Sequence, residues 1–176
     1  FKFGVFDNPF PNPTNVNKIG SYNHRLVAKK AVRESLVLLK NEDILPISKK
    51  TNKIVVVGEH ANSSGLQSGG WTVNWQGTRE NYKGATTILD GIKKHAEGVV
   101  GYDKEATENH SDADLAIVVV GEPPYAEFFG DIGHESNQLT LTLTEKHKKY
   151  INYYKNKGIK TLVVLISGRP MVASDE

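Results

Sequence analysis

The chain has 176 residues, 22 of them basic and 20 acidic, with a formal charge of +2 and no cysteine. This length fits one domain with a sizeable core. The mixed charges offer no basic stripe to a nucleic acid, and no apolar run reaches the ~18 residues of a membrane span. Without cysteine, disulfides and thiolate metal sites are excluded. We therefore expect neither nucleic acid nor membrane as a partner.

Residues 1–22 are predicted to form a linker. They hold three of the seven prolines, and Asn8-Pro9 and Asn12-Pro13 favour extended and turn conformations. From Asn23 to Leu39, apolar residues recur at helical spacing, which predicts a helix of about five turns with Asn23 as N-cap. We assign residues 23–176 to one domain. Both ends of the sequence read as interruptions of a longer protein.

Strands and helices are predicted to alternate along the rest of the chain. Continuous β-branched runs predict buried strands at 53–58, 115–121 and 161–166, with a shorter strand at 99–102. Helices are predicted at 85–95 and after Thr142, which has capping-box spacing to Glu145. This alternation indicates an α/β fold: a three-layer α/β/α sandwich around a mainly parallel sheet, incomplete at its C-terminus.

Two loops that follow strands are candidates for chemistry, because parallel sheets carry their sites beyond the carboxyl ends of the strands. The loop 58–78 contains Trp71 and Trp75 between glycines. Two tryptophans in a loop either plug the loop onto the sheet or offer a surface to a flat apolar ligand such as the C–H face of a sugar.

The loop 121–137 contains clustered acids and aromatics. Glu127 has aromatic neighbours, and an apolar surround raises the pKa of a carboxyl group, as a general acid near neutral pH requires. Glu122 directly follows a strand and is expected to hydrogen-bond backbone or to orient a neighbour. The alternative for each acid is a solvated loop position. A retaining glycosidase needs two carboxyl groups about 5 to 5.5 Å apart, and this chain is expected to supply one.

Other site types are disfavoured. Gly58 is not followed by the G-x-G-x-x-G turn, no phosphate-binding G-x-x-x-x-G-K-[ST] occurs, and Ser167 lies in Ser-Gly-Arg-Pro rather than G-x-S-x-G. The histidines show no metal-ligand spacing, so we expect surface or capping roles for them. They are His24, His60, His95, His110, His134 and His147. No cofactor and no metal are expected.

Motifs spread over the whole chain resemble the second domain of family 3 glycoside hydrolases. Their order is that of the plant-type exo-β-glucanase branch and its bacterial relatives. The motifs are Gly4-Val5-Phe6-Asp7-Asn8-Pro9, the run ending in Leu38-Leu39-Lys40-Asn41, Gly69-Gly70-Trp71 to Trp75-Gln76-Gly77, Gly121-Glu122 with Pro124-Tyr125-Ala126-Glu127, Gly130-Asp131, and Ser167-Gly168-Arg169-Pro170.

The resemblance implies a retaining exo-β-glycosidase acting on β-glucosides or short β-glucans. It implies Glu127 as acid/base and Trp75 as one side of a sugar clamp. The supporting residues of the same wall are Trp71, Glu122, Tyr125 and Asp131. The nucleophilic aspartate comes from an N-terminal (β/α)8 barrel, which is not in this sequence, so the chain alone is expected to be inactive. The alternative is a non-catalytic carbohydrate-binding or scaffolding module that uses the two tryptophans as a platform.

Overall fold

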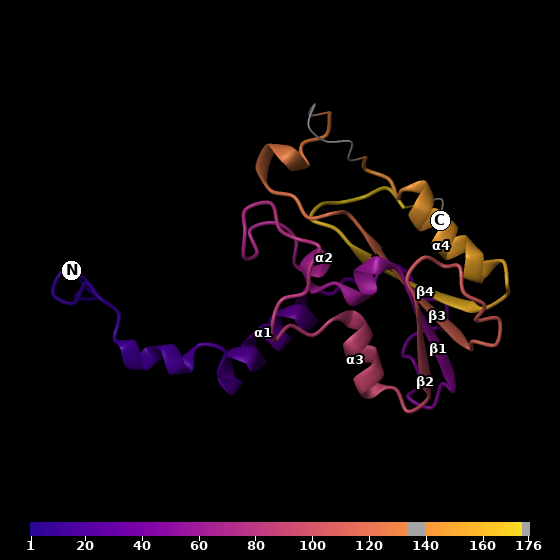
Figure 1. The fold of residues 1–176 in the computed structure, drawn as a ribbon, viewed down its shortest axis with the longest axis horizontal. Helices are drawn as coiled ribbons and strands as arrows, with labels where there is room; N and C mark the ends of the chain where they lie inside the picture. Colours follow the sequence, from indigo (N-terminus) through magenta and orange to yellow (C-terminus); the bar gives the residue numbers. More distant parts are fainter. Residues whose placement is uncertain (134–139, 174–176) are drawn as a thin grey trace. The chain divides into compact units, whose positions relative to one another are not determined.

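The computed structural model describes residues 1–133 and 140–173 (Figure 1). The chain divides into two compact units, Phe1–Glu42 and Asp43–Glu176. In the described residues, no helix combines the length and the apolar character needed to cross a bilayer.

The first unit contains one 3-10 helix, η1 (Pro13–Lys18), and one α-helix, α1 (Tyr22–Ser35). The predicted five-turn helix from Asn23 to Leu39 is wrong at both ends, because Ser21 is the N-cap and Leu36 leaves the helix with extended dihedral angles. Helical spacing alone does not sustain a helix, since most helical stability in proteins comes from packing an apolar face. Within this unit nothing buries the run from Leu36 to Leu39.

The second unit is built on a four-stranded, all-parallel sheet in the order β2-β1-β3-β4. The strands are β1 (Lys53–Val57), β2 (Val99–Asp103), β3 (Leu115–Gly121) and β4 (Lys160–Ile166). Every residue of β3 is buried, as its unbroken apolar sequence requires. The four predicted strands and the predicted α/β fold are thus confirmed.

Alternate residues of the two central strands face two separate cores. On one face, Val57 and Val118 pack with Tyr150 and Tyr154 of α4 (Glu145–Lys155). On the other face, Val56 and other central-strand residues pack with Leu89 of α3 (Ile88–His95) and with Ala61 of the short helix η2 (Glu59–Asn62). Helices on both faces of a sheet make the predicted three layers. Each fully buried aliphatic side chain stabilises the folded state by roughly 1.5 to 3 kcal/mol relative to leaving it exposed.

Both helices begin at caps that differ from the predicted starts. The cap of α4 is Thr144, whose side chain accepts a hydrogen bond from the backbone N–H of His147, so the predicted capping box at Thr142 is wrong. The helix α3 starts three residues later than predicted, at a capping box between Thr87 and Asp90. These caps satisfy backbone donors that the first helical turn leaves unpaired.

Parallel pairing brings the carboxyl ends of β1, β3 and β4 to one edge of the sheet, where Gly58, Glu122 and Ser167 begin the next segments. The strand order reverses between β1 and β3, since β2 lies on the other side of β1. Such a reversal is where open α/β sheets place ligands. Both loops selected from the sequence leave this edge.

Candidate functional site

The tryptophan loop (69–77) is a tight turn that follows the short helix α2 (Ser64–Ser68). The Trp71 N–H donates to the carbonyl of Trp75 at 2.9 Å and closes the loop. Trp71 and Val73 both have positive φ, at 56° and 66°. Non-glycine residues adopt this region at a cost, so surrounding contacts must hold the loop in shape.

Those contacts come from the loop 122–131, which follows β3. The Gln76 side chain accepts from the Ala126 N–H at 2.9 Å and donates to the Ala126 carbonyl at 3.3 Å. Gly70 lies against this loop so closely that an added Cβ would be 2.1 Å from the carbonyl oxygen of Tyr125. The glycines that bracket the tryptophans therefore serve a close approach between backbones.

Four aromatic residues form an aromatic wall: Trp71, Trp75, Phe128 and Phe129. The Trp75 ring lies 5.8 Å from Phe128 and 5.9 Å from Phe129 in edge-to-face geometry, and 6.4 Å from Trp71. Trp71 remains 69% exposed and Trp75 40% exposed. Trp75 thus packs on its neighbours and offers surface at the same time, while Trp71 mainly offers surface.

Glu127 opens the 3-10 helix η3 (Glu127–Gly130), directly before Phe128 of the aromatic wall. Its φ is +51° and its side chain is exposed. With the residues that the structure describes, its carboxylate makes no hydrogen bond or ion pair. Because the Glu127 side chain is exposed, the described part of the chain does not enclose it in the apolar surround expected from its aromatic neighbours. The structure does bring Glu127 and Trp75 to the same corner of the molecule, since Trp75 contacts the residue next to Glu127.

Glu122 has the opposite environment. It is 7% exposed, and its Oε1 accepts from Arg169 Nε at 2.9 Å and Nη2 at 2.6 Å. Its Oε2 accepts from the hydroxyls of Tyr125 at 3.0 Å and Ser167 at 2.6 Å. We call Glu122, Tyr125, Ser167 and Arg169 the carboxylate cluster. Burial, then the hydrogen bond to Glu122, raises the pKa of Tyr125, which keeps its hydroxyl a donor.

Asp131, the last of the predicted site residues, directly follows η3. Its backbone N–H donates to the Phe128 carbonyl at 3.0 Å, and its side chain is exposed. Trp71, Trp75, Glu127 and Asp131 are thus exposed, whereas Glu122 is buried and Tyr125 is half-buried. The two loops are in contact, as a single site requires.

The expectation of surface or capping roles is wrong for two histidines beside the carboxylate cluster. His60 is 2% and His147 8% exposed, with their rings 5.7 Å apart. Burial lowers the pKa of His60, and burial, followed by the electrostatic interaction with His60, lowers the pKa of His147 to about 4. His60 Nε2 lies 3.0 Å from the Glu122 carbonyl, so the neutral ring donates there. His134 lies outside the described residues.

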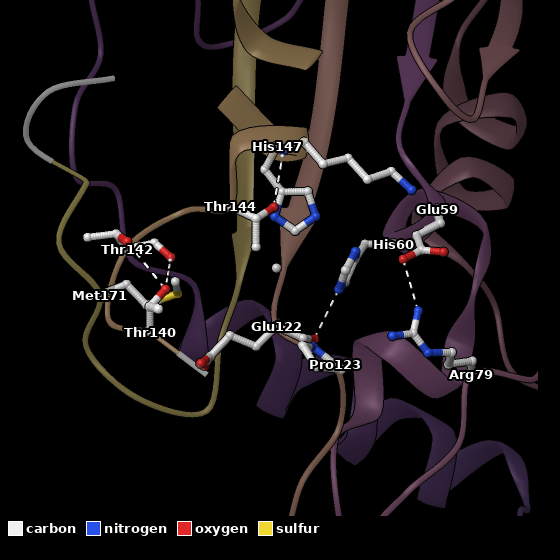
Figure 2. Close-up of a pocket in the computed structure, with 12 residues that line it drawn as sticks. Glu59, His60, Arg79, Glu122, Pro123, Thr140, Thr142, Thr144, His147 and Met171 are labelled. Carbon is white, nitrogen blue, oxygen red and sulfur yellow. Dashed lines mark hydrogen bonds and ion pairs between the residues drawn. The ribbon is translucent and has the colours of Figure 1, made fainter. Parts of the chain in front are cut away.

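A pocket of about 360 Å³ lies between these histidines and the carboxyl edge of the sheet (Figure 2). An ion pair between Glu59 and Arg79 at 3.0 Å lies on its rim, and Lys146, on the same rim, pairs with Glu105. The buried His60 Nδ1 has no hydrogen-bond partner among the residues that the structure describes. Within residues 1–133 and 140–173, no three His, Asp or Glu side chains are grouped to hold a metal ion.

Sequence reasoning missed the roles of Gln76 and Arg169. Gln76 joins the two loops, and Arg169 clamps the carboxylate cluster. The available signal for Arg169 was its place in Ser-Gly-Arg-Pro directly after a buried strand, which puts it at the edge where the site lies.

Comparisons with known proteins agree with this fold. Residues 36–176 match the model of the glycosyl hydrolase family 3 C-terminal domain. A lysosomal beta glucosidase of Dictyostelium discoideum is 29% identical over 98% of this chain and 23% of its own length. A periplasmic beta-glucosidase of Salmonella typhimurium is 26% identical over all of this chain and 27% of its own. The chain thus spans about a quarter of these relatives.

A solved structure is similar in both sequence and fold. The exo-1,3/1,4-beta-glucanase of a Pseudoalteromonas species superposes with a TM-score of 0.76 and 37% identity, over 88% of this chain and 19% of that one.

Proposed function

Because the chain belongs to glycosyl hydrolase family 3, whose C-terminal domain its residues 36–176 match, we propose that it supplies the acid/base half of a retaining exo-β-glycosidase. The substrate we propose is a β-glucoside or a short β-glucan that loses its terminal glucose. One observation carries the proposal: an exposed carboxylate, Glu127, lies next to an exposed aromatic wall on two interlocked loops.

In this reaction Glu127 acts twice. It first gives its proton to the leaving glycosidic oxygen while an aspartate of an N-terminal (β/α)8 barrel attacks the anomeric carbon. It then takes a proton from the water that releases the sugar from that aspartate, so the anomeric configuration is retained. Trp75 stacks on the sugar. The side of the site to which Trp75 belongs is supported by Trp71, Tyr125, Glu122 and Asp131. The nucleophile lies outside this chain, so the chain alone should not hydrolyse glycosides.

The test uses a protein in which a family 3 barrel precedes Phe1. This joined protein should hydrolyse β-glucosides with retention, and Glu127→Gln should lower kcat/KM for an alkyl glucoside by about 100-fold or more. A dinitrophenyl glucoside, whose leaving group needs little protonation, should lose less than about 10-fold. Equal losses on both substrates would contradict an acid role for Glu127.

The matched control is Glu97→Gln, because Glu97 is also exposed but lies just before β2, at the opposite edge of the sheet. It should leave both kcat/KM values unchanged.

The exposure of Trp71 and Trp75 also fits a carbohydrate-binding module without catalysis. Titrating the chain with cellobiose and following tryptophan fluorescence separates the two functions. Half of an active site should bind at millimolar strength or weaker, whereas micromolar binding would favour the module.

A further inference from the structure

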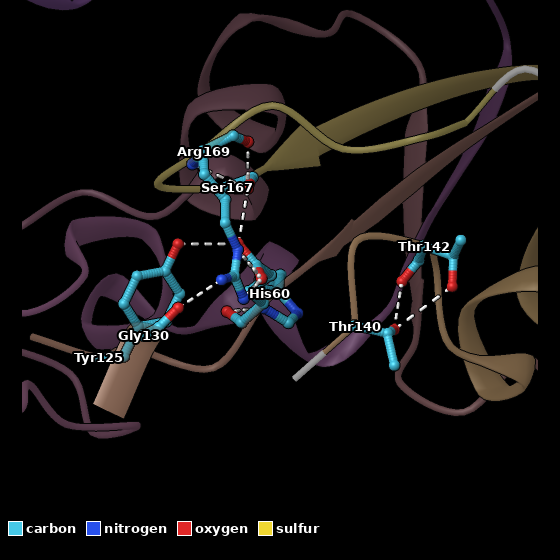
Figure 3. Close-up of polar contacts among 8 residues, drawn as sticks. His60, Tyr125, Gly130, Thr140, Thr142, Ser167 and Arg169 are labelled. Atoms are coloured by element: carbon cyan, nitrogen blue, oxygen red, sulfur yellow. Dashed lines mark hydrogen bonds and ion pairs between the residues drawn. The ribbon is translucent and has the colours of Figure 1, made fainter. Parts of the chain in front are cut away.

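The segment that carries Glu127 is fastened at both of its ends by one side chain. Arg169 binds the Glu122 carboxylate through Nε and Nη2. Its Nη1 donates to the Gly130 carbonyl (Figure 3). Glu122 and Gly130 flank Glu127 in sequence, five residues before it and three after it. A guanidinium group suits this task because its N–H donors diverge in a rigid plane.

Tyr125 fills the space beneath this clamp. Its ring lies 4.9 Å from the Arg169 guanidinium carbon, and its hydroxyl donates to Glu122. Gly130 and Gly168 leave room for the ring, since an added Cβ would be 2.5 Å and 2.8 Å from Tyr125 atoms. The guanidinium is therefore held by a carboxylate, a carbonyl and an aromatic face, with little freedom to move.

Glu127 itself needs such support. Its φ of +51° lies in the left-handed region, which a residue with a side chain adopts at a cost of about 1 kcal/mol or more. The residue before it, Ala126, is fixed by Gln76. On the other side, η3 ends at Gly130, where Arg169 binds. The direction of the Glu127 side chain depends on these two anchors.

We propose that Arg169 is a positioning residue that aims the Glu127 carboxyl at the glycosidic oxygen by clamping Glu122 and Gly130 together. The inference rests on the proposed function, because it needs Glu127 to be the acid. It adds a link from the end of β4 to the loop after β3, so the Ser-Gly-Arg-Pro turn has a role in proton transfer without touching the substrate.

The test compares Arg169→Met in the joined protein with Arg79→Met as the matched control. Arg79 also forms an ion pair, with Glu59, but holds no part of the segment 122–130. Arg169→Met should lower kcat/KM for an alkyl glucoside by about tenfold, because a displaced acid transfers its proton less efficiently, and should change the dinitrophenyl value by less than about twofold. Arg79→Met should change neither.

The deciding measurement repeats Arg169→Met in the Glu127→Gln background. If Arg169 acts through Glu127, the second substitution should cost less than about twofold there, since the acid is already lost. A full tenfold loss in that background, or equal losses on both substrates, overturns the positioning role and leaves Glu127 as the acid. Equal losses for Glu127→Gln alone overturn the acid role, and the inference with it.

Arg169→Lys keeps the test valid if the methionine variant does not fold. A lysine retains the positive charge and can bind Glu122, but it lacks the planar fork that also reaches Gly130. It should show the same preference for alkyl glucosides with a smaller loss. A lysine variant with equal losses on both substrates would again overturn the proposal.

Discussion

The carboxylate cluster and the aromatic wall both draw residues from the segment 122–131, yet they differ in almost every physical respect. In the cluster, both oxygens of Glu122 are hydrogen-bonded within the chain and shielded from water. Five residues later, Glu127 is exposed beside tryptophans that also present surface to solvent. Two glutamates in one loop are thus suited to different tasks: one holds the loop, and the other can meet a ligand.

This difference shows how a loop can present a reactive group without being loose. A buried, fully paired carboxylate costs desolvation, and the ion pair and hydroxyl bonds offset that cost only while all partners remain. An exposed carboxylate has no such dependence and can be exchanged without harm to the fold. Substitution of Glu122 should therefore lower stability, whereas substitution of Glu127 should lower activity with little effect on stability.

The largest expected effect is a loss of stability when the negative charge of Glu122 is removed from the carboxylate cluster. Glu122→Gln should lower the free energy of unfolding of the chain by about 3 kcal/mol, because the half-buried Arg169 is left without its counter-ion and the buried site of residue 122 loses its ion pair. Glu127→Gln should change it by less than about 0.5 kcal/mol. Urea unfolding at pH 7.5 measures both. Similar values for the two variants would remove the distinction between the glutamates.

The sequence allowed the sheet to be predicted but not the cluster. Runs such as Val55 to Val57 and Val118 to Val120 are β-branched and short, which favours a strand buried on both faces. The pairing of Glu122 with Arg169 joins residues 47 positions apart, and it depends on β3 and β4 being neighbours. Turn motifs carry no information about such a partner until the strand order is known.

The histidines were missed for a related reason. His60 and His147 come from different elements and stand among polar residues in the sequence. Their burial arises only when the start of α4 packs beside η2 at the edge of the sheet. The resemblance to a family identified the tryptophans and Glu127 as candidates, because those motifs are local in sequence.

The second expected effect is a loss of stability in acid. The pKa of His147 is about 4 in the folded chain, against ~6.5 in an unfolded chain. Between these values the unfolded state binds a proton that the folded state excludes, so stability falls as the pH is lowered through this window. From pH 7.5 to pH 5, His147 alone should account for about 2 kcal/mol of lost stability.

The substitution His147→Gln should remove this part of the acid sensitivity, whatever it does to stability at pH 7.5. Urea unfolding at the two pH values measures the difference. His95→Gln is the matched control, because His95 is exposed at the end of α3, and this variant should keep the full acid loss. If the His147→Gln variant keeps the full acid loss as well, His147 does not exclude a proton in the folded chain, and water reaches it more than its burial implies.

The smallest expected effect separates the two tryptophans of the wall. Trp75→Ala should lower the free energy of unfolding by about 1 kcal/mol, because it removes edge-to-face contacts with Phe128 and Phe129. Trp71→Ala should change it by less than about 0.5 kcal/mol, since Trp71 is 69% exposed. Urea unfolding of both variants provides the comparison. A Trp71 variant as unstable as the Trp75 variant would mean that the first indole holds the loop instead of offering its face to a ligand.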